Sequence, residues 1–268
     1  MARELPPKTE IIERIDLHQV QRDVYEAIRL SMHSRVSAAI AERGWARSRI
    51  IILDALLQLR QACCDPRLLK QAADGGEDGR ARRTKGNTAR NPIARRATAG
   101  SAKLDRLEEM LIELLVEGRR ILVFSQFTSI LSLIEERLAK RAIAYALLTG
   151  ATRDREAAIR LFEDGTVSVF LVSLKAGGTG LNLIAADTVI LYDPWWNPAV
   201  EDQAVDRAYR IGQTKPVFVH KLVASGTIEE KMEILKDRKS ALAQSLFDHD
   251  GAPTLAMTQA DLDLLLAS

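Results

Sequence analysis

The sequence predicts an α/β protein built on a doubly wound parallel sheet. From residue 118 onward, short continuous apolar segments typical of buried strands alternate with amphipathic helical segments. The expected strands are 121–124, 143–148, 167–172, 188–192 and 217–223, and the expected helices are 130–140, 153–163, 198–211 and 228–246. Right-handed crossover connections would place helices on both faces of the sheet.

Before residue 118 the hydrophobic pattern is helical. The first set of residues at helical spacing is Val20, Val24, Ala27, Ile28 and Ser31. The second set ends before Pro66 and consists of Ile52, Leu56, Leu59 and Cys63. A third helix, 104–116, has five leucines on one face: Leu104, Leu107, Leu111, Leu114 and Leu115. We therefore expect an N-terminal helical arm ahead of the sheet.

The composition is that of an ordinary globular protein. Of the 268 residues, 47% are hydrophobic and 28% are charged, which excludes a mostly disordered chain. No run approaches the ~18 apolar residues of a membrane helix, and residues 1–7 lack the apolar segment of a secretory signal. We therefore expect a cytoplasmic protein without a membrane partner. Cys63 and Cys64 are adjacent, with no ligand partners nearby, and are expected to be small buried side chains.

Four regions are expected along the chain: 1–73, 74–102, 103–250 and 251–268. Region 74–102 has seven basic and three acidic residues and Ile93 as its only large aliphatic residue, which predicts a flexible basic insertion. It is either an arm that contacts DNA phosphates or a tolerated surface loop. In the last region, residues 258–266 predict a short helix with Leu262, Leu265 and Leu266 on one face, which either docks on the lobe or meets a partner.

Three polar loops follow expected strands, at 125–128 (SQFT), 173–182 (SLKAGGTGLN) and 193–198 (DPWWNP). In a doubly wound sheet, such loops share one edge and bind ligands there. The glycine-rich loop is not a dinucleotide fingerprint, because Leu183 stands where the third glycine belongs, and no glycine in the chain precedes Lys and Ser or Thr. Ser173, Lys175 and Thr179 remain as donors toward an anion, with a tight strand-to-helix turn as the alternative.

The helix expected after Asn197 carries an unusual basic stripe. At 100° per residue, the buried face consists of Val200, Ala204, Ala208 and Ile211. Beside it lies a stripe of Gln203, Arg207 and Arg210. Because an unpaired guanidinium near the core is costly, Arg207 should meet an anion. That anion is either a ligand or one of the neighbouring carboxylates, Asp202 and Asp206.

Three segments resemble helicase motifs IV, V and VI of the Swi/Snf family of DNA-dependent ATPases in superfamily two. They are 121–131 (ILVFSQFTSIL), 172–197 (VSLKAGGTGLNLIAADTVILYDPWWN) and 202–213 (DQAVDRAYRIGQ). Residues 5–10 and 59–64 resemble the link between the lobes of that family and its helical protrusion, so 1–73 would be link and protrusion. Two RecA-like lobes sandwich ATP in this family. Region 103–250 resembles the second lobe, and the chain has no phosphate-binding loop or Asp-Glu pair of the first.

The resemblance implies a role for each motif residue. Arg210 would be the arginine finger, with Arg207 and Gln203 beside it at the γ-phosphate. Residues near the nucleotide would be Gly178, Gly180 and Asn182. Contacts with the DNA backbone would come from Ser125, Gln126, Thr149, Gly150, Ser173, Lys175, Ala176, Gly177 and Thr179. Trp195 and Trp196 would either couple DNA contact to lobe closure or seat their loop on the core.

The function implied is that of the C-terminal lobe of an ATP-dependent double-stranded DNA translocase or remodeller. ATP would be shared with a first lobe, in cis or in trans, and that lobe would bind Mg²⁺; no metal site is expected in this chain. Alone, the chain would not hydrolyse ATP. The alternative is a free-standing, non-catalytic module that binds DNA or a protein partner. An enzyme acting on a small molecule is disfavoured by the failed dinucleotide fingerprint.

Overall fold

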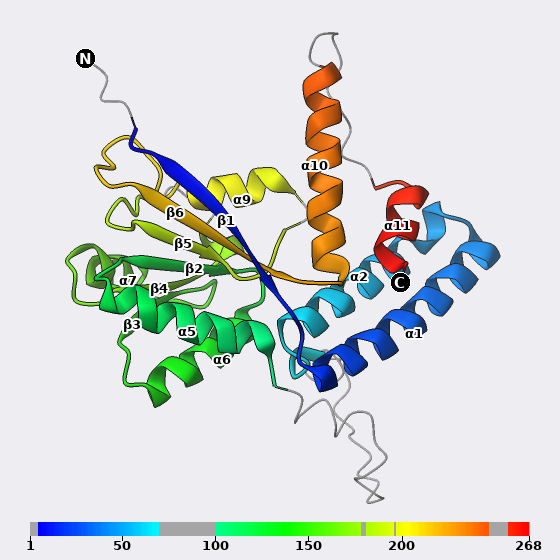
Figure 1. Ribbon diagram of the computed structural model, residues 1–268, viewed down its shortest axis with the longest axis horizontal. Coiled ribbons are helices and arrows are strands. Elements are labelled where there is room, and N and C mark those ends of the chain that lie inside the picture. Colours follow the sequence, from blue (N-terminus) through cyan, green and yellow to red (C-terminus); the bar gives the residue numbers. More distant parts are fainter. Residues whose placement is uncertain (1–4, 70–99, 178–180, 196, 247–256, 268) are drawn as a thin grey trace, which may run out of the picture. The chain divides into compact units, whose positions relative to one another are not determined.

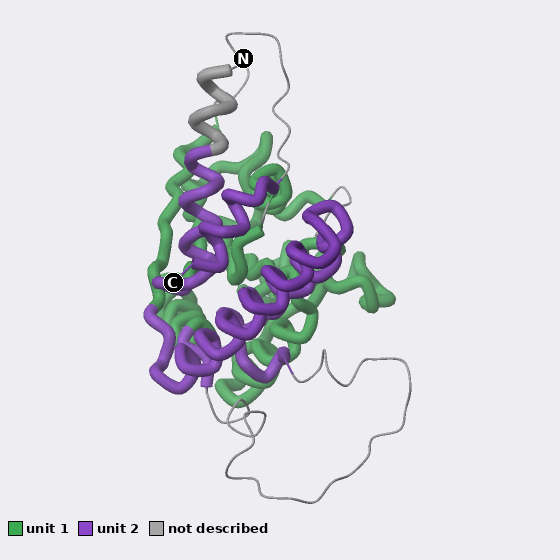
Figure 2. Tube along the Cα trace, turned by 90° about the vertical axis from the view of Figure 1, so that its right-hand side faces the viewer, with its two compact units in different colours: residues 1–15, 103–223 green, residues 16–102, 224–268 purple. Residues whose placement is uncertain are grey.

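The computed structural model describes residues 5–69, 100–177, 181–195, 197–246 and 257–267, with side chains of 239–246 left out. The chain divides into two compact units (Figures 1 and 2). Unit 1 comprises residues 1–15 and 103–223, and unit 2 comprises 16–102 and 224–268. This division differs from the expected regions, because the first strand joins the sheet and the segment from 224 onward packs with the N-terminal helices. The expected insertion 74–102 lies almost entirely outside the described residues.

Unit 1 contains one six-stranded sheet in the order β1-β6-β5-β2-β4-β3 (Figure 1). The pairs β2–β4, β2–β5, β3–β4 and β5–β6 are parallel, as the sequence predicts. The strands are β1 Lys8–Ile15, β2 Ile121–Ser125, β3 Tyr145–Leu148, β4 Val169–Ser173, β5 Thr188–Leu191 and β6 Val217–Ala224. The sequence analysis missed β1, which lies at the edge of the sheet and is largely exposed.

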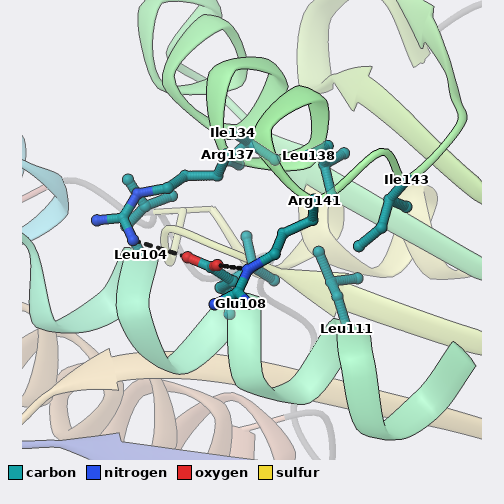
Figure 3. Close-up of a pocket in the computed structure, with 9 residues that line it drawn as sticks. Leu104, Glu108, Leu111, Ile134, Arg137, Leu138, Arg141 and Ile143 are labelled. Atoms are coloured by element: carbon teal, nitrogen blue, oxygen red, sulfur yellow. Dashed lines mark hydrogen bonds and ion pairs between the residues drawn. The ribbon is translucent and has the colours of Figure 1, made fainter. Parts of the chain in front are cut away.

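One face of the sheet is covered by α5 (Ala102–Val116) and α6 (Thr128–Lys140). These two helices enclose a small apolar hollow (Figure 3). Glu108 of α5 lies at its rim, where it is 2.7 Å from Arg137 Nη1 and 2.6 Å from Arg141 Nε of α6. No residue at a strand end lines this hollow, so it is not part of the candidate site.

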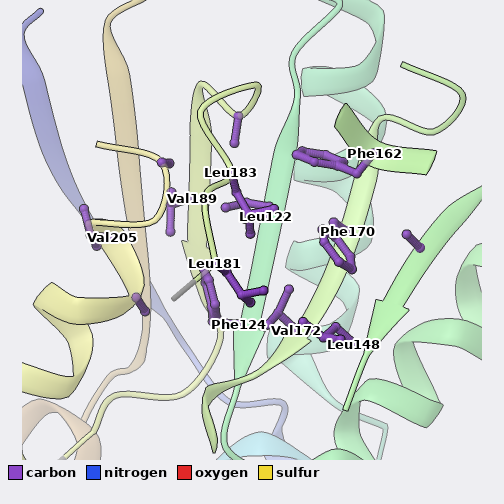
Figure 4. Packing of buried hydrophobic residues seen from close by; sticks show 14 of the residues in the cluster. Leu122, Phe124, Leu148, Phe162, Phe170, Val172, Leu181, Leu183, Val189 and Val205 are labelled. Atoms are coloured by element: carbon purple, nitrogen blue, oxygen red, sulfur yellow. The ribbon is translucent and has the colours of Figure 1, made fainter. Parts of the chain in front are cut away.

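The opposite face is covered by α7 (Arg155–Glu163), α8 (Leu174–Gly177) and α9 (Pro198–Val205). Their apolar residues pack against alternate residues of the strands, including Phe124, Phe170 and Val189 (Figure 4). The rings of Phe162 on α7 and Phe170 on β4 have centroids 5.4 Å apart. Helices on both faces confirm the doubly wound architecture.

Unit 2 is helical, with α1 (Gln19–Arg43), η1 (Ala46–Ser48), α2 (Arg49–Cys64), α10 (Ile228–Leu246) and α11 (Gln259–Leu266). The predicted buried face of α2 is confirmed, and Cys63 and Cys64 are buried thiols without a disulfide. Tyr25 of α1 is buried and its hydroxyl accepts a hydrogen bond from Ile228 N (2.7 Å). Burial raises the pKa of Tyr25, so this hydroxyl stays protonated at neutral pH.

The predicted face of α1 is largely wrong. Ile28 is buried as predicted, but Val20 is 44% exposed, and the helix buries Gln21, Tyr25 and Met32 beside Ile28. Gln21 can be buried because its amide is fully used: Nε2 donates to the carbonyls of Ala62 and Cys63, and Oε1 accepts from Ala102 N. A hydrophobic periodicity cannot reveal a buried polar residue of this kind.

The predicted C-terminal helix is present as α11. Its three leucines, Leu262, Leu265 and Leu266, are buried, which supports the docking alternative. Thr258 and Asp261 form a capping box at its start. At its end, Arg29 Nη1 of α1 donates to Leu266 O (2.9 Å) and Lys231 Nζ of α10 donates to Ala267 O (2.6 Å). These bonds satisfy terminal carbonyls that the helix itself leaves without partners.

We predict that Glu108→Gln destabilises the protein in a pH-dependent way. Hydrogen bonds from Arg141 and Arg137 hold the pKa of Glu108 below its ordinary value of 4.5, against the opposing effect of burial. The native pKa is lowered, so the stabilisation is complete above about pH 4.5 and is lost as the pH falls through the lowered pKa. Urea unfolding should show a loss of roughly 1–2 kcal/mol at neutral pH that shrinks as the pH falls below 4.5.

Glu109→Gln is the matched control, because Glu109 is 65% exposed and its contact with Arg106, at 3.4 Å, is longer than those of Glu108. Its effect should stay below about 0.5 kcal/mol at every pH. Equal losses of unfolding free energy in the two variants would contradict the stabilising role given to Glu108.

Candidate functional site

The register of the parallel strands brings the predicted loops to one edge of the sheet. Ser125 pairs with Ser173 at the ends of β2 and β4. Leu148 pairs with Val172, so Thr149 follows β3 beside the same position. Leu191 pairs with Phe124, which puts the loop containing Asp193 on the other side of Ser125. The polar residues that the sequence singles out after four different strands therefore lie in one row.

Asp193 organises the centre of this row. Its carboxylate is buried and accepts hydrogen bonds from Ser125 Oγ (2.5 Å) and from Gln126 N (3.2 and 3.3 Å). Ser125 Oγ in turn accepts from Phe127 N at 3.1 Å. Ser125 is fully buried and its hydroxyl donates to Asp193, and its expected place at a DNA phosphate stays a prediction. Gln126 is only partly buried at the same edge.

The loop after β4 begins with the short helix α8. Ser173 is buried, and its Oγ accepts a hydrogen bond from Ala176 N (3.3 Å). Arg155, the first residue of α7, donates to Ala176 O (2.8 Å) from the opposite side. Lys175 is exposed between these two fixed points, while the Ala176 side chain is buried. Gly177 ends α8; the predicted residues Gly178, Thr179 and Gly180 lie outside the described residues.

The loop after β3 is a tight turn. Thr149 N donates to Thr152 Oγ1 (2.9 Å), and Ala151 N donates to Thr149 Oγ1 (3.2 Å). Gly150 at the tip is exposed and Thr149 is partly buried. Both residues therefore remain accessible at the edge where the row of strand ends lies.

The helix expected over 198–211 is shorter than predicted, since α9 ends at Val205. Arg207 N and Ala208 N bond to carbonyls three residues back, Ala204 O (3.3 Å) and Val205 O (3.0 Å), and the chain then turns. The helical wheel consequently fails at Ile211 but not at Ala208. Ile211, expected on the buried face, is 86% exposed, whereas Ala208 is buried as expected.

Gln213 holds the turn that follows α9, and the sequence analysis gave it no role. Its Nε2 lies 3.1, 2.8 and 3.0 Å from the carbonyl oxygens of Ile184, Ala186 and Ala208. Its Oε1 accepts from the main-chain N–H groups of Thr214 and Lys215, both at 2.9 Å. A buried amide this fully used fixes the turn after α9 against the segment that follows the glycine-rich loop. In the sequence, Gln213 directly after Gly212 was the one sign of this turn.

The turn separates the three predicted motif VI side chains. Arg207 is buried, and its main-chain carbonyl accepts from Leu183 N (3.0 Å). Arg210 and Gln203 are exposed, and so is Asn182 one residue before Leu183. Asp202 and Asp206 are exposed, whereas Arg207 is buried.

Trp195 lies in the loop between β5 and α9. Its main-chain N–H donates to Glu201 Oε1 (2.7 Å), and the residue is partly buried. Trp196 lies outside the described residues. Asn197 caps α9, accepting from Ala199 N at 3.1 Å, as the Asn-Pro sequence at the helix start suggests.

Two absences concern only the described part of the chain. It contains no helix long and apolar enough to cross a membrane. It also contains no group of three or more His, Cys, Asp and Glu side chains placed to hold a metal ion.

Comparisons with known proteins agree with this geometry. Residues 102–212 match the helicase conserved C-terminal domain. The chain is 37% identical over 234 residues to the human "SWI/SNF-related matrix-associated actin-dependent regulator of chromatin subfamily A member 1", covering 86% of this chain and 21% of that protein. It is 33% identical over 244 residues to the "CHD3-type chromatin-remodeling factor PICKLE" of Arabidopsis thaliana, covering 90% and 16%. The chain thus spans about a fifth or less of the length of these relatives.

Solved structures resemble the chain over nearly its whole length. The Sulfolobus solfataricus SWI2/SNF2 ATPase C-terminal domain has a TM-score of 0.67 at 28% identity, covering 96% of this chain and 97% of that chain. The Sulfolobus solfataricus SWI2/SNF2 ATPase core in complex with dsDNA has a TM-score of 0.71 at 29% identity, covering 98% and 51%.

The sheet and its motif-bearing edge are those of a RecA-like helicase C-terminal domain. The chain belongs to the Swi/Snf family of ATPases and corresponds to the C-terminal lobe.

We predict that Asp193→Ala destabilises unit 1 by about 2–4 kcal/mol, because it leaves the buried Ser125 hydroxyl and the Gln126 N–H without their acceptor. Urea unfolding monitored by circular dichroism measures the change. Asp202→Ala, an exposed aspartate on α9, should change the free energy of unfolding by less than about 0.5 kcal/mol. A similarly small change for Asp193→Ala would show that the carboxylate does not organise the loops.

Proposed function

We propose that the chain is the second ATPase lobe of an ATP-dependent double-stranded DNA translocase. One observation carries the proposal. The turn that presents Arg210 is bonded directly to the segment after the glycine-rich loop, through Leu183 N to Arg207 O and through the Gln213 amide. Two motifs that the family uses toward nucleotide and DNA are thereby held as one rigid piece.

In this proposal Arg210 is the arginine finger. It is exposed, so its guanidinium can reach a phosphate held by another lobe, while the fixed turn limits the entropy lost when it does so. A planar, permanently charged donor suits a transition state whose negative charge spreads over the phosphoryl oxygens. Gln203 and Arg207 would line the same nucleotide site, with Gly178, Gly180 and Asn182 beside the nucleotide.

ATP and Mg²⁺ belong to the proposal in a shared way. The first lobe would supply the phosphate-binding lysine and the carboxylates that hold Mg²⁺, because this sequence has no Gly-Lys-Ser/Thr loop. When bound, the metal neutralises charge on the phosphates. The residues of this chain would orient the γ-phosphate and stabilise the charge that develops on it.

The DNA contacts proposed are with the sugar-phosphate backbone. Lys175, Gly150, Thr149 and Gln126 are accessible at the strand-end edge, and Ala176, Gly177 and Thr179 would contribute around the glycine-rich loop. Ser125 and Ser173 would act from behind, by holding these loops in place. Such contacts position a duplex without reading its sequence. The structural relative solved with double-stranded DNA supports this assignment.

The proposed setting is DNA packaged with protein. The two curated relatives described above carry chromatin in their names, and they give no support to the expected cytoplasmic location. The proposal also includes a protein partner, such as a separate first lobe.

We predict that the chain alone does not hydrolyse ATP and that adding a Swi/Snf first lobe in trans gives hydrolysis stimulated by duplex DNA. Arg210→Ala should lower that rate by roughly 10³–10⁵-fold, the usual contribution of an arginine finger. Phosphate release with and without duplex DNA measures both effects.

Arg160→Ala is the matched control, since Arg160 is also exposed and pairs with Glu156 on its own helix α7, and it should leave the rate unchanged. DNA-stimulated hydrolysis by the chain alone that survives Arg210→Ala would overturn the proposal.

A further inference from the structure

Glu201 is a buried carboxylate that neither the motifs nor the proposed function uses. It lies in the first turn of α9, and its Oε1 accepts the main-chain N–H of Trp195 at 2.7 Å. Its other oxygen, Oε2, is 3.7 Å from Nζ of Lys221 on β6. Lys221 Nζ is in turn 3.0 Å from Glu10 Oε2 on β1. One ammonium group is therefore shared by two carboxylates from different elements.

These three side chains connect neighbouring elements of the sheet. β1 and β6 are adjacent, β6 is adjacent to β5, and Trp195 follows β5 in the chain. The charges also become progressively less accessible toward the loop: the side chains of Glu10, Lys221 and Glu201 are 39%, 19% and 5% exposed. Hydrogen bonds from Lys8 and Lys221 lower the pKa of Glu10 against the effect of its burial, so it is charged at neutral pH.

We infer that Glu10, Lys221 and Glu201 form a positioning network that sets the conformation of the Trp195 loop. Lys221 is its central member, because its ammonium group lies beside both the Glu10 carboxylate and the buried Glu201 carboxylate. The network begins on the strand that follows residues 5–7 and ends on the loop between β5 and α9. Its consequence for DNA contact rests on the proposed function, whereas its effect on Trp195 does not.

A simpler account is that Glu201 only caps its own helix. An acidic side chain in the first turn is favoured by the helix dipole and can accept a main-chain N–H without any partner on β6. The two accounts differ in what Lys221 does. If Glu201 is a local cap, removing the ammonium group should not change the Trp195 loop. If the network holds, removal takes a positive charge away from beside a buried carboxylate, and the loop bonded to that carboxylate changes.

The test uses Trp195 as its own probe. The chain has three tryptophans, Trp45, Trp195 and Trp196, so a Trp45→Phe/Trp196→Phe background leaves Trp195 alone. In this background Lys221→Met keeps the aliphatic stem and removes the charge. We expect the acrylamide quenching constant of Trp195 to rise about twofold as the loop opens locally. Lys221→Met combined with Glu201→Gln should return it to within about a fifth of the background value, because the buried charge is removed with its partner.

Lys215→Met is the matched control. Lys215 is also a lysine beside a buried carboxylate, but it is 60% exposed and 3.8 Å from Asp187. It should leave the quenching of Trp195 unchanged. The inference is overturned if Lys221→Met leaves the quenching constant of Trp195 as unchanged as Lys215→Met does. It is also overturned if the double variant has the same raised quenching constant as Lys221→Met. Should Lys221→Met fail to fold by circular dichroism, Glu10→Gln takes its place; a smaller rise supports the network and no change overturns it.

Duplex affinity separates this inference from the proposed function. Binding of a fluorescent duplex, followed by anisotropy, should weaken in Lys221→Met and recover in the double variant. If the parent chain binds no duplex, the proposed DNA contact fails, and the quenching of Trp195 still decides whether the network positions the loop.

Discussion

The parallel register of β5, β2, β4 and β3 is the constraint on which the candidate site depends. Because parallel strands end at the same edge, four loops far apart in sequence meet there, and the register places Ser125 directly beside Ser173. The buried Asp193 carboxylate then fixes the loop after β2 to the loop after β5. Strand register decides which loops meet, and a few buried polar contacts decide their conformations.

The turn after α9 shows how a short helix can be preferable to a long one. A helix continued to Ile211 would use the carbonyl of Arg207 in its own hydrogen bond to Ile211 N. Ending it at Val205 frees this carbonyl for Leu183 N, and the Gln213 amide bonds to the carbonyl of Ala208. The arginines consequently leave the regular stripe that a helix would give them: Arg207 is buried and Arg210 is exposed. Two arginines three residues apart in one motif therefore lie in different environments.

Most of the sheet could be predicted from the sequence because buried parallel strands are apolar throughout. β2, β4 and β5 are buried at every position, so short apolar runs of this kind are typical of buried strands. β1 was missed because an edge strand is half exposed and reads as a polar segment. The buried face of α1 was wrong for a related reason, since Gln21 is buried through hydrogen bonds that no periodicity registers. In the site, the loops were predictable, but the partners of Asp193, Gln213 and Glu201 depend on tertiary contacts.

The position of β1 has a consequence for the order in which the chain acquires its structure. Its neighbour in the sheet is β6, and the bond from Val217 N to Pro7 O joins residues separated by most of the chain. Contacts so distant in sequence form slowly, because a long loop must close before they contribute anything. During synthesis β1 emerges before the other strands of this sheet, yet its partner strand β6 is made after all of them. Among the strands of this sheet, β1 is thus made first and paired among the last.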